Sequence, residues 1–277
     1  MTTEYKDNFV LIKDITSFNL KQTLECGQCF RWQKKGENTY YGIAYDKTLT
    51  VCQQNSQLKF HCSKDDFENI WYDYFDLQTD YDKIRKDIAK INPLLDEIQQ
   101  FSFGIRILKQ DSWEALCSFI ISQNNNIPRI TGIIRRLCEN FGEKTADGNY
   151  TFPSAKTLSQ YTVDDFSVLR SGFRAKYIAD ACQKVVSGEI DLNKIRQMPI
   201  ETARTELMKI KGVGKKVADC TMLYGMGKKE CFPIDVWIKR AMNTLFPDVI
   251  TESFGENAGI IQQYIYYYSR MNKELFQ

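Results

Sequence analysis

The sequence predicts an α+β protein, in which an antiparallel β-sheet region is followed by an all-helical region. Two observations predict this class. From Phe30 to Cys62 apolar and polar residues alternate, as they do in β-strands. Beyond Asp111 apolar residues recur at three- and four-residue steps, the spacing of one helix face. We therefore expect two domains, a sheet with helices over residues 1–105 and a helical domain over residues 106–277.

The sheet region contains four alternating segments, separated by breaks that suit the tight turns of a meander. The segments are F-R-W-Q, Y-Y-G-I-A-Y, L-T-V-C-Q and L-K-F-H-C, and the breaks are K-K-G-E-N, D-K and Q-N-S-Q. From Asp65 the apolar period changes to that of a helix, and another helical stretch covers about residues 80–100.

Helix boundaries are marked by particular residues in the second region. Asp111 stands at the front of D-S-W-E-A-L-C-S-F-I-I-S, where an acidic residue is typical of a helix N-terminus. Pro128 lies in the first turn of the next expected helix, and Gly142 follows its end. Further helices are expected over residues 175–187, 200–209, 215–224, 236–245 and 257–271.

Composition limits the classes of function. A net charge of only +2 gives little support for a polyanionic partner unless the charges are clustered. The single histidine, His61, excludes a multi-histidine metal site. The nine cysteines are scattered, and the C-x-x-C of Cys26 and Cys29 has no second pair at zinc spacing. We therefore expect reduced thiols in a cytoplasmic protein without a membrane-spanning segment.

The stretch K-G-V-G-K-K-V-A-D-C, from Lys211 to Cys220, begins in the turn between two expected helices. Such a turn leaves backbone N–H groups unpaired at the start of the second helix, where they suit a phosphate oxygen. Gly212 and Gly214 allow close approach because neither carries a Cβ atom. The alternative is an ordinary tight turn with a solvated lysine edge.

Helical spacing separates the two adjacent lysines of this stretch. Lys215 shares a face with Asp219, which predicts a surface ion pair between them. Lys216 shares a less polar face with Cys220, where loss of hydration favours the neutral, nucleophilic amine. Lys216 is therefore the candidate for chemistry, and Lys215 is the candidate for a structural role.

Asp235 stands nineteen residues after Lys216, in P-I-D-V, just before an expected helix. An aspartate in this position either caps the helix or faces a cationic centre across a cleft. The combination of G-V-G-x-K with P-x-D-V resembles the helix–hairpin–helix DNA glycosylases of the endonuclease III superfamily. No cysteine follows Cys231, so the iron–sulfur cluster that some members hold with four cysteines is not expected.

Within that superfamily the chain resembles the 8-oxoguanine DNA glycosylase/lyases over nearly its whole length. The matching blocks are C-G-Q-C-F-R-W, S-Q-N-N-N-I-P-R-I-T-G, F-R-A-K-Y, G-V-G-K-K-V-A-D-C, P-I-D-V and A-G-I-I-Q. The resemblance implies a TBP-like antiparallel sheet before a helical HhH-GPD domain. It implies excision of 8-oxoguanine opposite cytosine through a lysine Schiff base, followed by strand cleavage by β-elimination.

The resemblance also implies roles for individual residues. Lys216 would attack the sugar C1′, and Asp235 would orient the site and stabilise the positive charge that develops on the sugar. The base would be flipped out of the duplex. Its pocket would consist of Gly27, whose carbonyl faces N7, together with Cys220, Gln262 and Tyr266.

Other implied contacts are with the DNA strands. Asn124 would fill the gap left by the flipped base, Arg129 and Arg174 would contact the orphaned cytosine, and Phe173 would act as a wedge. The remaining implied DNA contacts are Asn125, Gly212, Gly214 and Lys215. A monovalent cation is implied at the backbone carbonyls of Met208, Ile210 and Val213, and no other cofactor is implied.

Three positions depart from the pattern of the family. Phe173 replaces a tyrosine, which loosens the expected preference for the opposite base. Trp237 stands in place of a histidine that contacts a phosphate, and Lys211 replaces a proline. Without the resemblance, Gln262 and Tyr266 would be ordinary helix residues, and the three asparagines would be a polar turn.

Two alternative functions remain open. One is a non-catalytic helix–hairpin–helix module that only binds DNA, and the other is a glycosylase for another oxidised or mismatched base. The expected partner is double-stranded DNA containing 8-oxoguanine. We expect a monomer, cytoplasmic in a prokaryote or nuclear if the source is eukaryotic.

Overall fold

The computed structural model describes residues 1–276, and the chain forms two compact units. The first, here the sheet unit, contains Met1–Gly42, Thr48–Lys109 and the chain from Lys229 onward. The second, here the helical unit, contains Ile43–Lys47 and Gln110–Lys228. We expected a single boundary between residues 105 and 106. The observed division differs, because the C-terminal segment belongs to the sheet unit. The return occurs because the last long helix buries its apolar face there.

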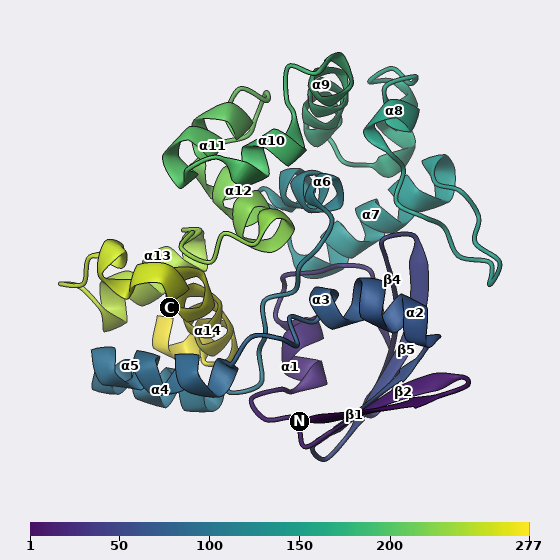
Figure 1. Ribbon diagram of the computed structural model, residues 1–277. Coiled ribbons are helices and arrows are strands. Elements are labelled where there is room, and N and C mark those ends of the chain that lie inside the picture. Colours follow the sequence, from purple (N-terminus) through teal and green to yellow (C-terminus); the bar gives the residue numbers. More distant parts are fainter. Residues whose placement is uncertain (277) are drawn as a thin grey trace. The chain divides into compact units, whose positions relative to one another are not determined.

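The sheet unit is built on a six-stranded antiparallel sheet with the order β1-β2-β6-β5-β4-β3 (Figure 1). Its strands are β1 Thr2–Lys6, β2 Phe9–Lys13, β3 Trp32–Gly36, β4 Thr39–Ala44, β5 Lys47–Gln54 and β6 Gln57–His61. The four strands of the expected meander are confirmed, and β1 and β2 are additional. Val10 of β2 pairs with Phe60 of β6, and both side chains are fully buried. The strand β2, F-V-L-I-K, was not identified from the sequence because its apolar residues form a continuous run rather than an alternation.

Aromatic side chains cover one face of this sheet. The π-helix Phe67–Trp71 lies between the short helices α2 Lys64–Asp66 and α3 Tyr72–Tyr74. The ring of Phe67 packs edge-on against Phe60 of β6 at 5.1 Å, and Phe75 packs against the same ring at 5.4 Å. Helix α1, Leu20–Glu25, is tied to β5 because Leu20 N donates to Gln53 Oε1 at 2.6 Å.

The stretch expected over residues 80–100 is helical, but it is divided into two helices. The structure has two helices, α4 Tyr81–Ile91 and α5 Pro93–Phe101. The break falls at Asn92, whose extended backbone is the conformation favoured before a proline. The Asn92 side chain then caps α5 by accepting from Leu94 N at 2.8 Å.

The helical unit surrounds one almost fully buried helix, α6, Ser112–Ser122 (Figure 1). Helices α7, α9 and α12 all pack against α6. Asp111 caps α6 as expected, accepting from Trp113 N and Glu114 N at 2.9 Å. The other helices are α7 Ile127–Phe141, α8 Ala155–Leu158, α9 Arg174–Ser187, α10 Leu192–Gln197, α11 Ile200–Leu207 and α12 Lys215–Cys220. The predicted ends of α7, at Pro128 and Gly142, are confirmed.

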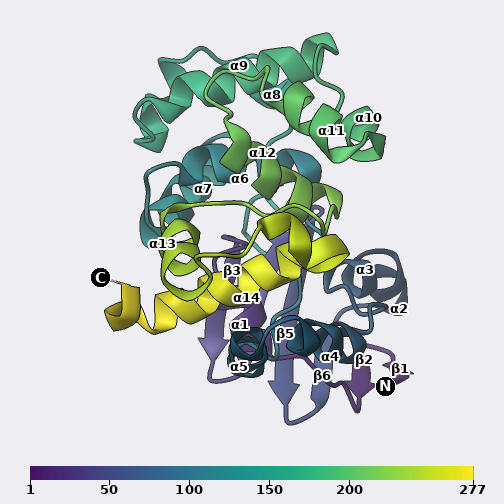
Figure 2. The same cartoon turned by 90° about the vertical axis from the view of Figure 1, so that its left-hand side faces the viewer.

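The C-terminal segment adds α13 Val236–Leu245 and α14 Ala258–Met271 to the sheet unit. Figure 2 shows these two helices side by side, and α14 also packs against α5. Along α14 the side chains of Ile260, Ile261, Tyr264 and Ile265 are buried. Among residues 1–276, no helix is both long enough and apolar enough to cross a membrane.

Candidate active site and nucleic-acid interface

Helices α11 and α12 and the turn between them form a helix–hairpin–helix. The turn is closed by Val213 N, which donates to Ile210 O at 3.0 Å, and Lys211 N donates to Asp180 Oδ2 at 2.7 Å. Gly212 has a left-handed φ of 77°, and a Cβ atom there would lie 2.3 Å from the ring of Tyr177. Gly214 is exposed at the start of α12, with open space where its Cβ would be. The two glycines therefore differ, since one is needed for packing and the other leaves the helix start accessible.

We predict that Gly212→Ala lowers the free energy of unfolding by about 2 kcal/mol, because it combines a left-handed backbone with a clash against an aromatic ring. Gly214→Ala is the matched control and is expected to change it by less than about 1 kcal/mol. Urea unfolding of the two variants measures both values. Equal losses would show that the contact between Gly212 and Tyr177 has no special weight.

Lys216 lies on the partly buried face of α12, whereas its neighbour Lys215 is exposed. Lys216 Nζ donates to Ser122 Oγ at 3.2 Å and lies 5.3 Å from the centre of the Phe119 ring. Ser122 Oγ in turn donates to Phe119 O at 2.8 Å, so both contacts come from the last turn of α6. Cys220, one turn further along α12, is buried. The amine is thus held by one hydroxyl and one aromatic face.

The expected ion pair between Lys215 and Asp219 is wrong. Asp219 is 1% exposed, and its Oδ1 accepts from Arg204 Nε of α11 at 2.6 Å. Arg204 also pairs with the exposed Glu201. Helical spacing identified a neighbour for Asp219 along α12, but the carboxylate faces the other helix of the hairpin. A buried carboxylate requires a partner within reach, and Arg204 supplies it.

The three asparagines form the turn between α6 and α7. Asn124 has a left-handed φ of 46°, and Asn125 Nδ2 donates to Ile121 O at 3.2 Å. Asn126 caps α7, because its Oδ1 accepts from Arg129 N at 3.0 Å. The turn leaves Asn124 and Arg129 exposed on its surface.

Arg174 is buried and binds backbone carbonyl oxygens at the asparagine turn. Its side chain belongs to a residue only 3% exposed, and Nε donates to Gln123 O at 2.9 Å. Nη2 donates to Asn124 O at 3.0 Å, and Nη1 donates to Ser171 O at 3.1 Å. Burial lowers the pKa of the guanidinium, and the charge of Arg129 adds to this effect. In the structure, therefore, the buried side chain of Arg174 stabilises the asparagine turn through hydrogen bonds to its carbonyl oxygens.

Phe173 presents an exposed aromatic ring beside this turn. The residue is 48% exposed, and its ring centre lies 4.4 Å from the guanidinium carbon of Arg174. The ring of Tyr177 packs against it edge-on at 5.6 Å. An apolar ring held in this way on the surface has the properties of a side chain that inserts between stacked bases.

In the sheet unit, Gly27 lies in a tightly held loop. Its φ of 87° is left-handed, which favours glycine. Cys26 O accepts from Gln263 Nε2 of α14 at 3.1 Å. The buried Gln28 side chain donates to Arg106 O at 2.8 Å and accepts from Leu108 N at 2.9 Å. The peptides on both sides of Gly27 are therefore fixed, which orients its carbonyl.

The thiols of the C-x-x-C are buried and are not joined in a disulfide. Cys26 Sγ donates to Thr23 O at 3.3 Å, and Cys29 Sγ donates to Leu24 O at 3.6 Å. Burial raises the pKa of Cys26 to about 12. Both thiols therefore pack as small apolar side chains at neutral pH.

Helix α14 carries the two other residues of the sheet unit that the resemblance assigns to a base pocket. Gln262 is 4% exposed, and Tyr266, four residues later on the same face, is half-buried. Arg270 Nη1 donates to Tyr266 Oη at 3.5 Å. Burial raises the pKa of Tyr266 to about 12, so the ring stays uncharged at physiological pH. Because Gln263 of the same helix holds Cys26, the loop of Gly27 and the start of α14 are directly connected.

Asp235 is the N-cap of α13, and its Oδ1 accepts from Ile238 N at 2.8 Å. The cap fixes the orientation of the carboxylate and uses one lone pair of Oδ1. A further role for the carboxylate is thus compatible with capping.

The site residues expected from the sequence fall on both units, each described by itself. The helical unit carries Asn124, Asn125, Arg129, Phe173, Arg174, Gly212, Gly214, Lys215, Lys216 and Cys220. The sheet unit carries Gly27, Asp235, Gln262 and Tyr266. Sequence reasoning missed the residues that hold them in position, namely Phe119, Ser122, Gln28 and Gln263. These side chains act through contacts between distant segments, for which no local sequence pattern exists.

Comparison with known proteins shows the family of the chain. Residues 10–116 match the family model of the 8-oxoguanine DNA glycosylase N-terminal domain, and residues 117–249 match that of the HhH-GPD superfamily base excision DNA repair proteins. An N-glycosylase/DNA lyase of Saccharomyces cerevisiae is 33% identical over 80% of this chain. That match spans 66% of the yeast protein.

Two solved structures resemble the chain over almost its full length. The structure of MBOgg1 in complex with a low-affinity DNA ligand has a TM-score of 0.93 and 43% identity, covering 98% of each chain. The Clostridium acetobutylicum 8-oxoguanine glycosylase/lyase was solved with double-stranded DNA containing cytosine opposite 8-oxoguanine. It has a TM-score of 0.92 and 38% identity, covering 99% of each chain.

The sheet, the buried central helix and the glycine hairpin thus define an α+β protein of the helix–hairpin–helix base excision repair class. Within that class the chain belongs to the 8-oxoguanine DNA glycosylase family.

Proposed function

We propose that this protein excises 8-oxoguanine, paired with cytosine, from duplex DNA and then cleaves the strand at the abasic site. The carrying observation is Lys216, a half-buried lysine held by Ser122 and Phe119 on the hairpin helix of a member of this family. The relatives named N-glycosylase/DNA lyase and the Clostridium complex with DNA support the choice of substrate and of both reactions.

In the first reaction, the Lys216 amine attacks C1′ of the flipped nucleotide. The bond between C1′ and N9 breaks, its electron pair leaves with the base, and the base gains a proton. Asp235 stabilises the positive charge that develops on the sugar, a role that its fixed orientation at the start of α13 supports. A nucleotide must leave the stack before this attack, because a duplex hides C1′.

The second reaction uses the covalent intermediate. After the nitrogen of Lys216 has lost one proton, its electron pair forms a second bond to C1′, while the bond between C1′ and the ring oxygen O4′ breaks and O4′ gains a proton. The resulting protonated Schiff base acidifies the hydrogens on C2′. Removal of one of them breaks the bond between C3′ and oxygen, and the 3′ phosphate leaves. Hydrolysis of the Schiff base then frees Lys216. Schiff-base chemistry of this kind needs an unprotonated amine as the nucleophile.

Recognition of the oxidised base is assigned to residues around one pocket. 8-Oxoguanine carries a hydrogen at N7 where guanine has a lone pair, so an acceptor facing N7 discriminates between them. We assign this acceptor to the carbonyl of Gly27, which the contacts of Cys26 and Gln28 hold in place. Gln262 binds the Watson–Crick edge, and Tyr266 and Cys220 contact the two faces of the base.

The opposite strand is assigned to the surface around the asparagine turn. Asn124 fills the gap left by the flipped base, Phe173 is the wedge, and Arg129 contacts the orphaned cytosine, with Asn125 beside them. Arg174 is assigned to the same cytosine, while its Nε and Nη2 bind the carbonyl oxygens of residues 123 and 124. Its first role is therefore to hold Asn124 in the left-handed conformation.

The hairpin is assigned to the phosphate backbone. The exposed start of α12 at Gly214 offers unpaired N–H groups, and Lys215 adds a positive charge beside them. The carbonyls of Met208, Ile210 and Val213 lie in the same turn, and the Ile210 oxygen keeps a lone pair beyond its bond from Val213 N. These oxygens suit a monovalent cation, and the proposed reactions require no other cofactor.

Borohydride trapping tests the proposed function. Wild-type protein is incubated with a duplex containing 8-oxoguanine opposite cytosine, and borohydride reduces any Schiff base to a stable adduct. We expect an adduct and a cleaved strand, and neither product with undamaged duplex. Binding without an adduct or free base would instead support the non-catalytic module, and preferential release of another base would support the alternative glycosylase.

The setting of this activity follows from its substrate. We propose that the protein acts as a monomer. Its location would be that of cellular DNA, which is the cytoplasm in a prokaryote and the nucleus in a eukaryote.

A further inference from the structure

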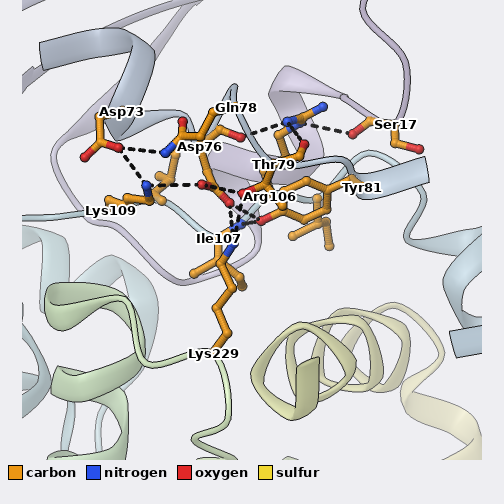
Figure 3. Close-up of polar contacts among 12 residues, drawn as sticks. Ser17, Asp73, Asp76, Gln78, Thr79, Tyr81, Arg106, Ile107, Lys109 and Lys229 are labelled. Atoms are coloured by element: carbon orange, nitrogen blue, oxygen red, sulfur yellow. Dashed lines mark hydrogen bonds and ion pairs between the residues drawn. The ribbon is translucent and has the colours of Figure 1, made fainter. Parts of the chain in front are cut away.

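Asp76 lies at the point of the sheet unit where the chain departs to the helical unit and where it returns. The chain leaves the sheet unit after Lys109 and re-enters it at Lys229. Lys229 Nζ lies 2.9 Å from Asp76 Oδ2, and Lys109 Nζ lies 3.4 Å from Asp76 Oδ1 (Figure 3). Asp76 is 0% exposed. One buried carboxylate therefore binds the side chains of both crossing points.

The acceptors of Asp76 are matched to the donors around it. Besides the two ammonium groups, Thr79 Oγ1 donates to Oδ1 at 2.9 Å, and Tyr81 Oη donates to Oδ2 at 3.0 Å. The Tyr81 oxygen itself accepts from Ile107 N at 2.9 Å, which directs its proton to Asp76. A carboxylate has about four acceptor positions, and here four donors use them. All acceptor positions of the Asp76 carboxylate are thus used by neighbouring side chains.

The backbone of Asp76 is fixed as firmly as its side chain. Its φ of 49° is left-handed, a conformation that aspartate and asparagine tolerate better than most residues. Arg106 Nη1 donates to Asp76 O at 2.9 Å, and the same guanidinium binds Thr16 O and Thr79 O (Figure 3). Burial lowers the pKa of Arg106, while the negative charges near it oppose that shift.

The cluster around Asp76 is connected to residues of the proposed site by one hydrogen bond and by one short segment of the chain. Lys229 O accepts from Gly259 N at 2.7 Å, in the first turn of α14, three residues before Gln262. Asp235 follows Lys229 by six residues. The position of Lys229 thus sets the start of the segment that ends at Asp235, and it also contacts the helix that carries Gln262.

We propose that Asp76 is a positioning residue for base excision. It fixes Lys229, and through Lys229 the segment that carries Asp235. Asp76 is not expected to contact DNA. This inference rests on the proposed function, because it assigns Asp235 a part in the departure of the base.

Three variants distinguish the contact between Asp76 and Lys229 from the neighbouring contact between Asp73 and Lys109. Asp76→Asn keeps the size and the backbone tolerance of the residue but turns an amide NH₂ toward groups that are themselves donors. Lys229→Met keeps the aliphatic stem and removes the ammonium group, together with its contacts to Asp76 Oδ2 and Thr79 Oγ1. Asp73→Asn is the matched control, because Asp73 binds Lys109 at 2.6 Å with a side chain that is largely exposed.

Each variant is tested in two reactions. One is single-turnover release of 8-oxoguanine, which needs charge stabilisation by Asp235. The other is borohydride trapping at a preformed abasic site, where no base departs. We expect Asp76→Asn and Lys229→Met to slow base release roughly 10- to 100-fold, with trapping reduced by less than about threefold. Asp73→Asn is expected to change both rates by less than about threefold. The double variant that combines Asp76→Asn with Lys229→Met is expected to release the base no more slowly than Asp76→Asn alone.

Other results would overturn the inference. Equal losses in both reactions, matching a fall in the folded fraction measured by urea unfolding, would show that Asp76 only stabilises the fold. Unchanged base release in Lys229→Met would remove the link to Asp235, and this variant decides the question if Asp76→Asn does not fold. Failure of the proposed function is recognised separately, because the wild-type protein would then release no 8-oxoguanine in the same series.

Discussion

Replacing Lys216 with glutamine is expected to abolish the borohydride adduct and to reduce strand cleavage by roughly a thousandfold or more. The amide of glutamine is not a nucleophile, and Ser122, the hydroxyl next to Lys216 Nζ, cannot form a Schiff base. The reaction therefore has no substitute for this amine. Single-turnover cleavage of a duplex with 8-oxoguanine opposite cytosine, together with trapping, measures the loss.

The neighbouring lysine supplies the control for this experiment. Lys215→Gln also removes one positive charge from the start of α12, but from an exposed side chain. We expect it to weaken binding to DNA by less than about tenfold, with an increase at higher salt, and to leave trapping at saturating protein intact. An adduct that survives Lys216→Gln and disappears in Lys215→Gln would reverse the assignment of the two lysines.

Replacing Arg204 with methionine is expected to lower the stability of the helical unit by about 3–5 kcal/mol, because it leaves the buried Asp219 without its ion-pair partner. Asp219 precedes Cys220 on α12, so the loss acts on the helix that carries Lys216. Urea unfolding followed by circular dichroism measures it, with each transition fitted separately if the two units unfold at different concentrations.

Glu201→Gln is the matched control for the buried pair. Glu201 contacts the same guanidinium, but its side chain is 85% exposed, and such surface pairs contribute about 0–1 kcal/mol. A loss of similar size in both variants would mean that burial of Asp219 does not set the strength of the pair.

Much of the fold follows from periodicity and from residues at element ends. Asp111 and Gly142 mark helix boundaries through local geometry, and the meander strands alternate over enough residues to be identified. The strand β2 was missed because its sequence, F-V-L-I-K, is a continuous apolar run and does not alternate. The return of α14 to the sheet unit could not be predicted, since it depends on packing against α5, more than 150 residues earlier.

The candidate site shows the same limit. The spacing of Lys216 and Cys220 predicted which lysine of the pair is partly buried, because both lie on one helix. The partner of Asp219 was wrong, because a buried carboxylate pairs across the hairpin with Arg204 and not along its own helix. The buried guanidinium of Arg174 was not anticipated either, since its acceptors are carbonyl oxygens about 50 residues away.

The return of the chain at Lys229 has a consequence for synthesis on the ribosome. The helical unit is nearly continuous in sequence, and all of its residues have been made once Lys228 is added. The sheet unit lacks α13 and α14 until the last segment emerges. Domains tend to fold as their chains become complete during translation. The unit that carries Lys216 is therefore expected to fold first, and the pocket residues of α14 take their places last.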